Sequence, residues 1–137
     1  MTDLPTQSYQ ITRADLVRYA GASGDFNPIH WSDRSALAVG LPGVIAHGMF
    51  TMALAGRAVA AWTGRPDAMV EYGTRFARPV VVPDDDAGAT LIVSGVNKGP
   101  VEGGLTRFDL TVTCAEEKVL VQARALVRLS DDPVAAG

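Results

Sequence analysis

The pattern of apolar and polar positions changes character near the middle of the chain. In the first half Ala and Gly are frequent, and residues 48–63 are apolar on nearly every side, with Arg57 as their only charge. This run is long enough for about four helical turns, and a helix without a polar face must be buried on most sides. The second half alternates Val, Thr and Leu with polar residues, which predicts strands. Helices followed by strands indicate an α+β architecture, in which a curved sheet covers the long helix.

Local signals place the remaining elements. Thr12 with Asp15 three residues later predicts the capped start of a helix over residues 13–22. A short helix is expected over 33–39. Strands are expected over 9–11, 68–76, 89–96, 105–115 and 119–129, with turns at 98–104 and 116–118. Residues 1–130 are expected to form a single domain and 131–137 a disordered tail.

Composition excludes several classes of protein. The chain has 137 residues, with 12 basic and 15 acidic side chains, and no basic cluster that would indicate nucleic-acid binding. Its only cysteine, Cys114, excludes a disulfide framework and a Cys-based zinc finger. The first residues do not resemble a signal peptide, and the long charge-free stretch at 35–56 contains Pro42 and four glycines, which are unfavourable for a membrane span. We therefore expect a cytoplasmic protein without a membrane or nucleic-acid partner.

Asp25 and His30 are the first candidates for chemistry. They are five residues apart, so only a turn can bring both side chains to one point, and Asn27-Pro28 between them favours a turn. A carboxylate beside an imidazole can act as a general acid–base pair. The spacing alone favours a plainer interpretation, in which Asp25 closes the turn and His30 is an ordinary histidine.

A second candidate lies where the apolar helix begins. Gly48 opens this helix, and the first N–H groups of a helix have no partner within it and lie at the positive end of its dipole. Such an N–H can stabilise an oxyanion, although an ordinary helix start explains the glycine equally well. The two histidines, His30 and His47, lie in separate Gly/Pro-rich loops without a metal-ligand spacing, so no metal is expected. Cys114 follows the alternation of its strand and is expected to be buried, and Arg57 is expected to need a polar partner.

Two motifs resemble one known family. Residues 19–30, which read Tyr-Ala-Gly-Ala-Ser-Gly-Asp-Phe-Asn-Pro-Ile-His, with Ala36 six residues further on, resemble the signature of the MaoC-like, (R)-specific enoyl-CoA hydratases. Residues 45–49, Ile-Ala-His-Gly-Met, resemble the second landmark of that family. Over most of the chain, the likeness is greatest to the catalytic beta subunits of mycobacterial type II 3-hydroxyacyl-ACP dehydratases.

The resemblance implies a fold, a reaction and a set of roles. The implied fold is a single hot-dog domain, and the implied reaction interconverts trans-2-enoyl and (R)-3-hydroxyacyl thioesters of CoA or acyl carrier protein. Asp25 and His30 would be the catalytic pair, with Asp25 favoured as the base in hydration, and the Gly48 N–H would form the oxyanion hole. Ser23 and Asn27 would support the loop. The thioester is the substrate, and no cofactor or metal is expected. A homodimer is expected, with a heterodimer of related hot-dog subunits as the alternative.

Other functions remain open at this point. A hot-dog thioesterase usually carries its carboxylate on the central helix, but residues 48–63 contain no Asp or Glu. A non-catalytic acyl-binding partner subunit would typically lack the pair of Asp25 and His30. Gly56 departs from the family pattern, because some members carry a serine there. The acyl pocket could be lined by large side chains of the apolar helix, namely Met49, Phe50, Met52 and Trp62, or these could only fill the core.

Overall fold

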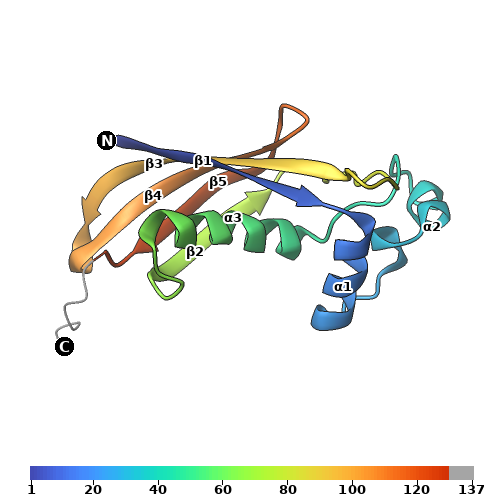
Figure 1. The fold of residues 1–137 in the computed structure, drawn as a ribbon, viewed down its shortest axis with the longest axis horizontal. Helices are drawn as coiled ribbons and strands as arrows, with labels where there is room; N and C mark the ends of the chain where they lie inside the picture. The colour runs from blue at the N-terminus through green and yellow to red at the C-terminus, as the bar shows by residue number, and fades with distance from the viewer. Residues whose placement is uncertain (130–137) are drawn as a thin grey trace.

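The computed structural model describes residues 1–129, so the tail expected at 131–137 lies outside the described residues. The chain order of the elements is visible in Figure 1. The elements are β1 (Thr2–Ile11), α1 (Arg13–Ser23), the 3-10 turn η1 (Pro28–His30), α2 (Asp33–Ala38), α3 (Gly48–Thr63), β2 (Met69–Phe76), β3 (Ala89–Val101), the 3-10 turn η2 (Glu102–Gly104), β4 (Leu105–Cys114) and β5 (Glu117–Val127).

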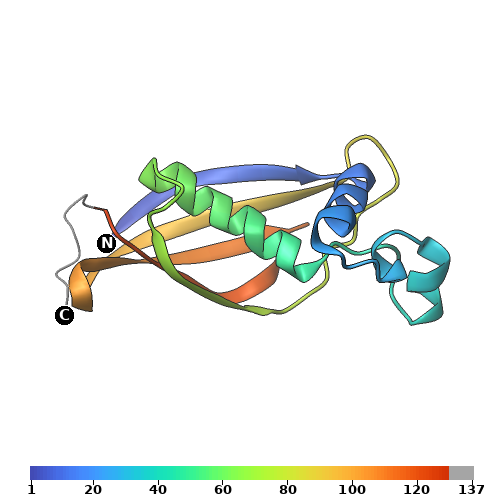
Figure 2. The same cartoon turned by 90° about the horizontal axis from the view of Figure 1, so that it is seen from below.

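One antiparallel sheet and one long helix dominate the molecule. The strands lie in the order β1-β3-β4-β5-β2, and each neighbouring pair is antiparallel. Helix α3 runs along one face of this curved sheet (Figure 2), and α1 and α2 lie beyond one end of it, near the start of α3 (Figure 1). This arrangement confirms the expected α+β hot-dog fold, a long helix wrapped by an antiparallel sheet.

The core lies between α3 and the sheet. The inner side of α3 buries Leu54, Ala55, Ala58 and Val59, which pack on buried side chains of the strands. The outward side is exposed at Met49, Ala53, Arg57 and Ala61, so the expectation of burial on most sides was wrong for this face. No helix within residues 1–129 is both long enough and apolar enough to cross a membrane.

Arg57 therefore does not need the buried polar partner that the sequence suggested. Its side chain is exposed and its guanidinium lies over the ring of Tyr9, 5.7 Å from the ring centre. A guanidinium at this distance from an aromatic ring gains a modest electrostatic attraction while it stays in water. The guanidinium is therefore not buried, and its charge does not lower the stability of the core.

Local signals located the helices well. Helix α3 has the expected bounds, and α1 begins after Thr12, whose capping box with Asp15 has both of its hydrogen bonds. The N–H of Asp15 donates to the Thr12 hydroxyl, and the N–H of Thr12 donates to the Asp15 carboxylate. These bonds satisfy backbone donors that the first turn leaves without partners.

Two strands are longer than expected. β1 begins at Thr2, not at residue 9, because it is an edge strand in which Pro5 loses no ladder hydrogen bond, and its register shifts between Leu4 and Gln7. β3 continues to Val101, so the expected turn at 98–104 shrinks to η2, and an irregularity beside Gly99 absorbs the turn-forming residues. Cys114, expected to be buried, ends β4 only partly buried against the core, and this burial raises the pKa of its thiol.

Candidate active site

A chain of side-chain hydrogen bonds shapes the loop that follows α1. The N–H of Asp25 donates to the Ser23 hydroxyl at 3.2 Å, and the N–H of Asn27 donates to Asp25 Oδ1 at 3.2 Å. The N–H of Ile29 then donates to Asn27 Oδ1 at 3.3 Å, which caps η1. Short polar side chains of this kind stabilise turns by satisfying the backbone that follows them. Ser23 and Asn27 therefore lie where a loop-supporting role requires them, and that role stays a prediction.

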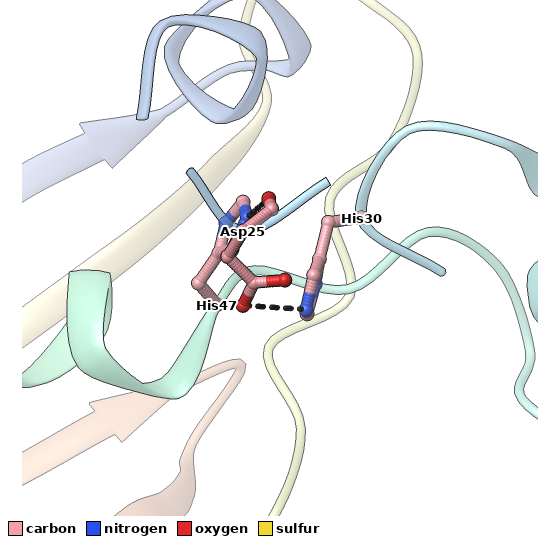
Figure 3. A group of neighbouring side chains, drawn as sticks. All are labelled: Asp25, His30 and His47. Carbon is pink, nitrogen blue, oxygen red and sulfur yellow. Dashed lines mark hydrogen bonds and ion pairs between the residues drawn. The ribbon is translucent and has the colours of Figure 1, made fainter. Parts of the chain in front are cut away.

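This loop brings Asp25 and His30 face to face. Asp25 Oδ2 lies 4.0 Å from His30 Nε2. Figure 3 marks this contact with a dashed line. The distance is too long for a direct hydrogen bond, but one water about 2.8 Å from each atom can bridge the two groups. The Asp25 side chain is 52% exposed and that of His30 is 9% exposed, so the carboxylate faces solvent and the imidazole lies in the interior.

The tautomer of His30 is set by its other ring nitrogen. Nδ1 lies 2.7 Å from the carbonyl oxygen of Ile45, which can only accept, so Nδ1 carries a proton. In the neutral ring Nε2 then presents its lone pair toward Asp25, and in the imidazolium it presents a proton. The N–H of Ile45 in turn donates to the Ile29 carbonyl at 3.1 Å, which joins the two loops on either side of the ring. His30 is thus prepared to exchange a proton at Nε2 only.

His47 also belongs to this cluster, although the sequence analysis assigned it no role. Its Nε2 donates to the backbone carbonyl of Asp25 at 3.1 Å, and its ring stacks on that of His30 at 3.9 Å with an angle of 24°. The residue is only 2% exposed, and burial lowers the pKa of its imidazole. The contact joins residues 22 positions apart, so no local spacing could predict it. Two weaker signals were available: both histidines lie in Gly/Pro-rich loops, and His47 lies in the motif at residues 45–49.

Gly48 is the first residue of α3, and the absence of its side chain has a clear reason. A Cβ at this position would lie 3.0–3.3 Å from three ring carbons of Phe76. Glycine therefore lets the Phe76 ring lie against the start of the helix. The Gly48 N–H has no acceptor within the helix and lies at the positive end of its dipole. This is the geometry that the predicted oxyanion-binding role needs, and the role itself stays a prediction.

His30 and Gly48 line the same cavity, which has a volume of about 300 Å³. Its walls are largely apolar and come from both loops, the start of α3, the end of β2 and the start of β5. The lining residues are His30, Ile45, Ala46, Gly48, Thr51, Phe76, Ala77, Arg78, Pro79, Val80, Val119 and Leu120. The four side chains suggested for an acyl pocket, Met49, Phe50, Met52 and Trp62, are not among them. Met49 is exposed instead, and Phe50 and Trp62 pack against the core.

The same cluster offers three potential metal ligands. Ligand atoms of Asp25, His30 and His47 all lie within 4.8 Å of one another. An imidazole binds a metal through a lone pair in the plane of its ring, about 2.0–2.1 Å from the ion. The rings of His30 and His47 are stacked face to face, so their in-plane lone pairs do not converge on one point. The arrangement suits proton transfer better than metal binding, and the absence of a metal stays a prediction.

Comparison with known proteins identifies the family. Residues 2–113 match the MaoC like domain. The chain belongs to this family. It is 41% identical over 103 residues to 3-hydroxyacyl-thioester dehydratase X of Mycobacterium tuberculosis, a match that covers 69% of this chain and 36% of that protein. The chain thus spans little more than a third of this curated relative. The family predicted from residues 19–30 and 45–49 is confirmed.

Solved MaoC-like structures share the fold. One described as a MaoC-like dehydratase superposes with a TM-score of 0.88 at 37% identity, over 93% of this chain and 39% of that one. The R-hydratase PhaJ1 of Pseudomonas aeruginosa superposes with a TM-score of 0.78 at 25% identity, over 99% of this chain and 91% of that one. The second match shows that the MaoC-like fold seen here corresponds to nearly the whole of a short relative.

Proposed function

We propose that this chain is a hydro-lyase that interconverts trans-2-enoyl thioesters and (R)-3-hydroxyacyl thioesters. The observation that carries the proposal is the pair of Asp25 Oδ2 and His30 Nε2, 4.0 Å apart, with His30 in the wall of a cavity that the start of α3 also lines. The names of two relatives, a 3-hydroxyacyl-thioester dehydratase and an R-hydratase, support it. The substrate would be the thioester of CoA or of acyl carrier protein, with no metal or further cofactor.

In hydration the pair would begin with one proton, as Asp25 carboxylate and His30 imidazolium. A water bridging the two groups loses a proton to Asp25 while its oxygen bonds to C3 of the enoyl chain. His30 Nε2 gives its proton to C2 as the C2–C3 double bond becomes single. The product gains one water in total, and transfer of the proton from Asp25 to His30 restores the starting state. Dehydration follows the same steps in reverse.

Charge that develops on the thioester oxygen would be stabilised at the start of α3. Addition of the water oxygen at C3 moves electron density onto this oxygen, as in an enolate. The Gly48 N–H and the dipole of the helix would stabilise that charge. Loss of one such donor typically raises the barrier by about 3–4 kcal/mol. The Nδ1–H of His30 stays bonded to Ile45 throughout, so the imidazole keeps its orientation in both charge states.

The test measures hydration of crotonyl-CoA by loss of the enoyl-thioester absorbance. Asp25→Asn and His30→Ala should each lower kcat by roughly 10²–10⁴-fold, which is the usual contribution of a general acid or base. Asp84→Asn is the matched control, because it removes a carboxylate that is exposed and does not line the cavity. Full activity in both site variants would overturn the proposed pair.

A second assay separates the reaction from its nearest rival. Release of free thiol from acyl-CoA would indicate a thioesterase, and its absence together with hydration would support the lyase. Absence of both activities, on enoyl thioesters of graded length, would favour a non-catalytic or partner-dependent subunit. Addition of a related hot-dog subunit would restore activity only in the partner-dependent case.

Exposed apolar side chains around the site support assembly into a dimer. Four large apolar side chains near the proposed catalytic groups are more than half exposed, namely Phe26, Trp31, Met49 and Phe76. The first three directly follow Asp25, His30 and Gly48 in sequence, and Phe76 lies against Gly48. Large apolar side chains that surround a site on the surface commonly mark an interface between subunits. The proposed state is a homodimer, and a native mass of a single chain would contradict it.

A further inference from the structure

His47 contacts Asp25, His30 and the start of α3, although the proposed proton transfers do not involve it. We infer that His47 is a positioning residue that aligns Asp25, His30 and the start of α3. The inference rests on the proposed hydratase function. His47 itself touches no reacting atom in the proposed mechanism, because its ring stacks on that of His30 and its Nε2 proton is donated to the Asp25 carbonyl.

The first contact fixes the backbone that carries the carboxylate. The Asp25 carbonyl accepts from His47 Nε2 at 3.1 Å, which ties the loop after α1 to the residue before α3 (Figure 3). Hydrogen bonds within the loop, such as that from Asn27 N–H to Asp25 Oδ1, set its internal shape but not its position on the helix. The bond from His47 therefore determines where Asp25 Oδ2 lies relative to the cavity.

The second contact fixes the ring of His30. The His47 ring stacks on it at 3.9 Å between ring centres, and Tyr19 lies 4.7 Å from His47. Tyr19 also contacts Phe50 of α3 at 5.0 Å, so the His47 ring is enclosed by aromatic neighbours. Because the residue is 2% exposed, it has little room to rotate. A ring that cannot rotate restrains the imidazole stacked on it.

The third contact is made by the backbone of the same residue. The His47 carbonyl accepts from the N–H groups of Phe50 at 3.0 Å and Thr51 at 3.1 Å, so His47 defines where α3 begins. The next N–H along the chain is that of Gly48. One residue consequently sets the position of the carboxylate, the imidazole and the amide.

The environment of His47 also favours its neutral form. Nδ1 is buried without a hydrogen-bond partner within residues 1–129, so a proton there would be a buried charge without an acceptor. A neutral ring can lie against the His30 imidazolium of the proposed cycle without repulsion between like charges. The positioning role thus does not compete with the proton transfer.

Two substitutions separate the contacts. His47→Phe keeps an aromatic ring for stacking but removes the donor to the Asp25 carbonyl. His47→Gln keeps an N–H donor near the position of Nε2 but removes the ring. His47→Phe should lower kcat by roughly 10- to 100-fold, since displacement of a reacting group by about 1 Å can have an effect of that size. KM should change less than twofold, and His47→Gln should restore part of kcat.

The decisive measurement is a double-mutant cycle with Asp25→Asn. If His47 acts by placing the Asp25 carboxylate, His47→Phe should lower activity much less in the Asp25→Asn background than in the wild type. An equal loss in both backgrounds, or wild-type kcat for folded His47→Phe, would overturn the inference. If His47→Phe fails to fold by circular dichroism, the same cycle is run with His47→Leu, which also lacks the donor to the Asp25 carbonyl.

A measurement independent of turnover keeps this inference distinct from the proposed function. In the wild type, nitrogen-15 NMR should show neutral His30 with its proton on Nδ1. His47→Gln, which removes the ring stacked on His30, should change the tautomer ratio of His30. If the wild type does not hydrate enoyl thioesters, the proposed function fails, and an altered His30 signal still supports the positioning. An unaltered signal overturns it.

Discussion

Gly95 in β3 provides the sharpest test of how α3 is seated on the sheet. A Cβ added here would lie 2.7 Å from Trp62 Cη2, 2.9 Å from Cζ3 and 3.3 Å from the Asp109 carbonyl oxygen. Carbon atoms in contact normally stay about 3.5–4.0 Å apart, so Gly95→Ala forces the ring of Trp62 to retreat by about 1 Å. The backbone at Gly95 does not have a positive φ, so alanine causes no backbone strain there.

Trp62 cannot retreat freely. Its Nε1 donates to the Pro5 carbonyl at 2.6 Å, and its ring meets Phe108 edge-on at 6.2 Å. Overpacking of this kind typically costs about 1–3 kcal/mol, against which alanine recovers about 0.4–1 kcal/mol by restricting the unfolded chain. We expect a net loss of roughly 1–2 kcal/mol, which for a chain of this size lowers Tm by roughly 3–10 °C.

Thermal and urea unfolding of Gly95→Ala measure this loss. Gly73→Ala in β2 is the matched control, because a Cβ there meets nothing within 4 Å and the backbone also has no positive φ. It should leave Tm unchanged or slightly raised. Trp62→Leu in the same chain should remove most of the penalty of Gly95→Ala. Equal Tm values for Gly95→Ala and the wild type, or an undiminished penalty beside Trp62→Leu, would refute the reasoning.

Three further predictions concern the caps, the core and the cavity. Thr12→Ala removes the capping box with Asp15 and should cost about 1 kcal/mol, visible as a lower urea midpoint; an unchanged midpoint would show that the box contributes nothing. Burial raises the pKa of Tyr72 to about 12, above its ordinary value of 10. The buried neutral phenol therefore stabilises the fold fully below pH 10, and the free energy of unfolding should fall as pH rises from 10 toward 12. Tyr72→Phe should flatten this fall, and an identical pH profile would contradict the prediction. Val80→Phe narrows the cavity and should lower kcat/KM for long enoyl-CoA substrates more than for crotonyl-CoA, whereas an equal effect at every chain length would place the acyl chain elsewhere.

The elements that sequence predicted well are those with local causes. Helix α3 follows from its uninterrupted apolar run, and its end follows from Gly64, which adopts the left-handed conformation of a helix C-cap. The true ends of β1 and β3 depend on pairing with a distant strand. Residues such as Pro5 and Gly99 indicate a break locally, yet an edge or an irregular register accommodates them.

The candidate site divides in the same way. The turn between Asp25 and His30 was predictable from Asn27-Pro28, and side-chain hydrogen bonds do shape it. The choice of Asp25 and His30 as the catalytic pair depended on the family resemblance, because their spacing alone favoured a plainer interpretation. His47 was missed because its bond to the Asp25 carbonyl exists only once α1 and α3 are packed together. Of the two alternatives left open for Met49, Phe50, Met52 and Trp62, the cavity wall is not the one observed, and α3 contributes Gly48 and Thr51 instead. The rest of the wall depends on contacts between separate halves of the chain, such as that of Phe76 with Gly48, which local patterns do not show.

The two sides of the cavity come from separate stretches of the chain, so substitutions can alter one side without the other. The groups that face each other across the proposed reaction all come from residues 25–48, whereas the opposite wall comes from residues 76–80 and from Val119 and Leu120. The residues proposed for catalysis and the residues that shape the opposite wall therefore lie in separate stretches of sequence. If the proposed function holds, substitutions in the far stretch would alter the length or shape of acyl chain that binds, without changing the residues proposed for proton transfer.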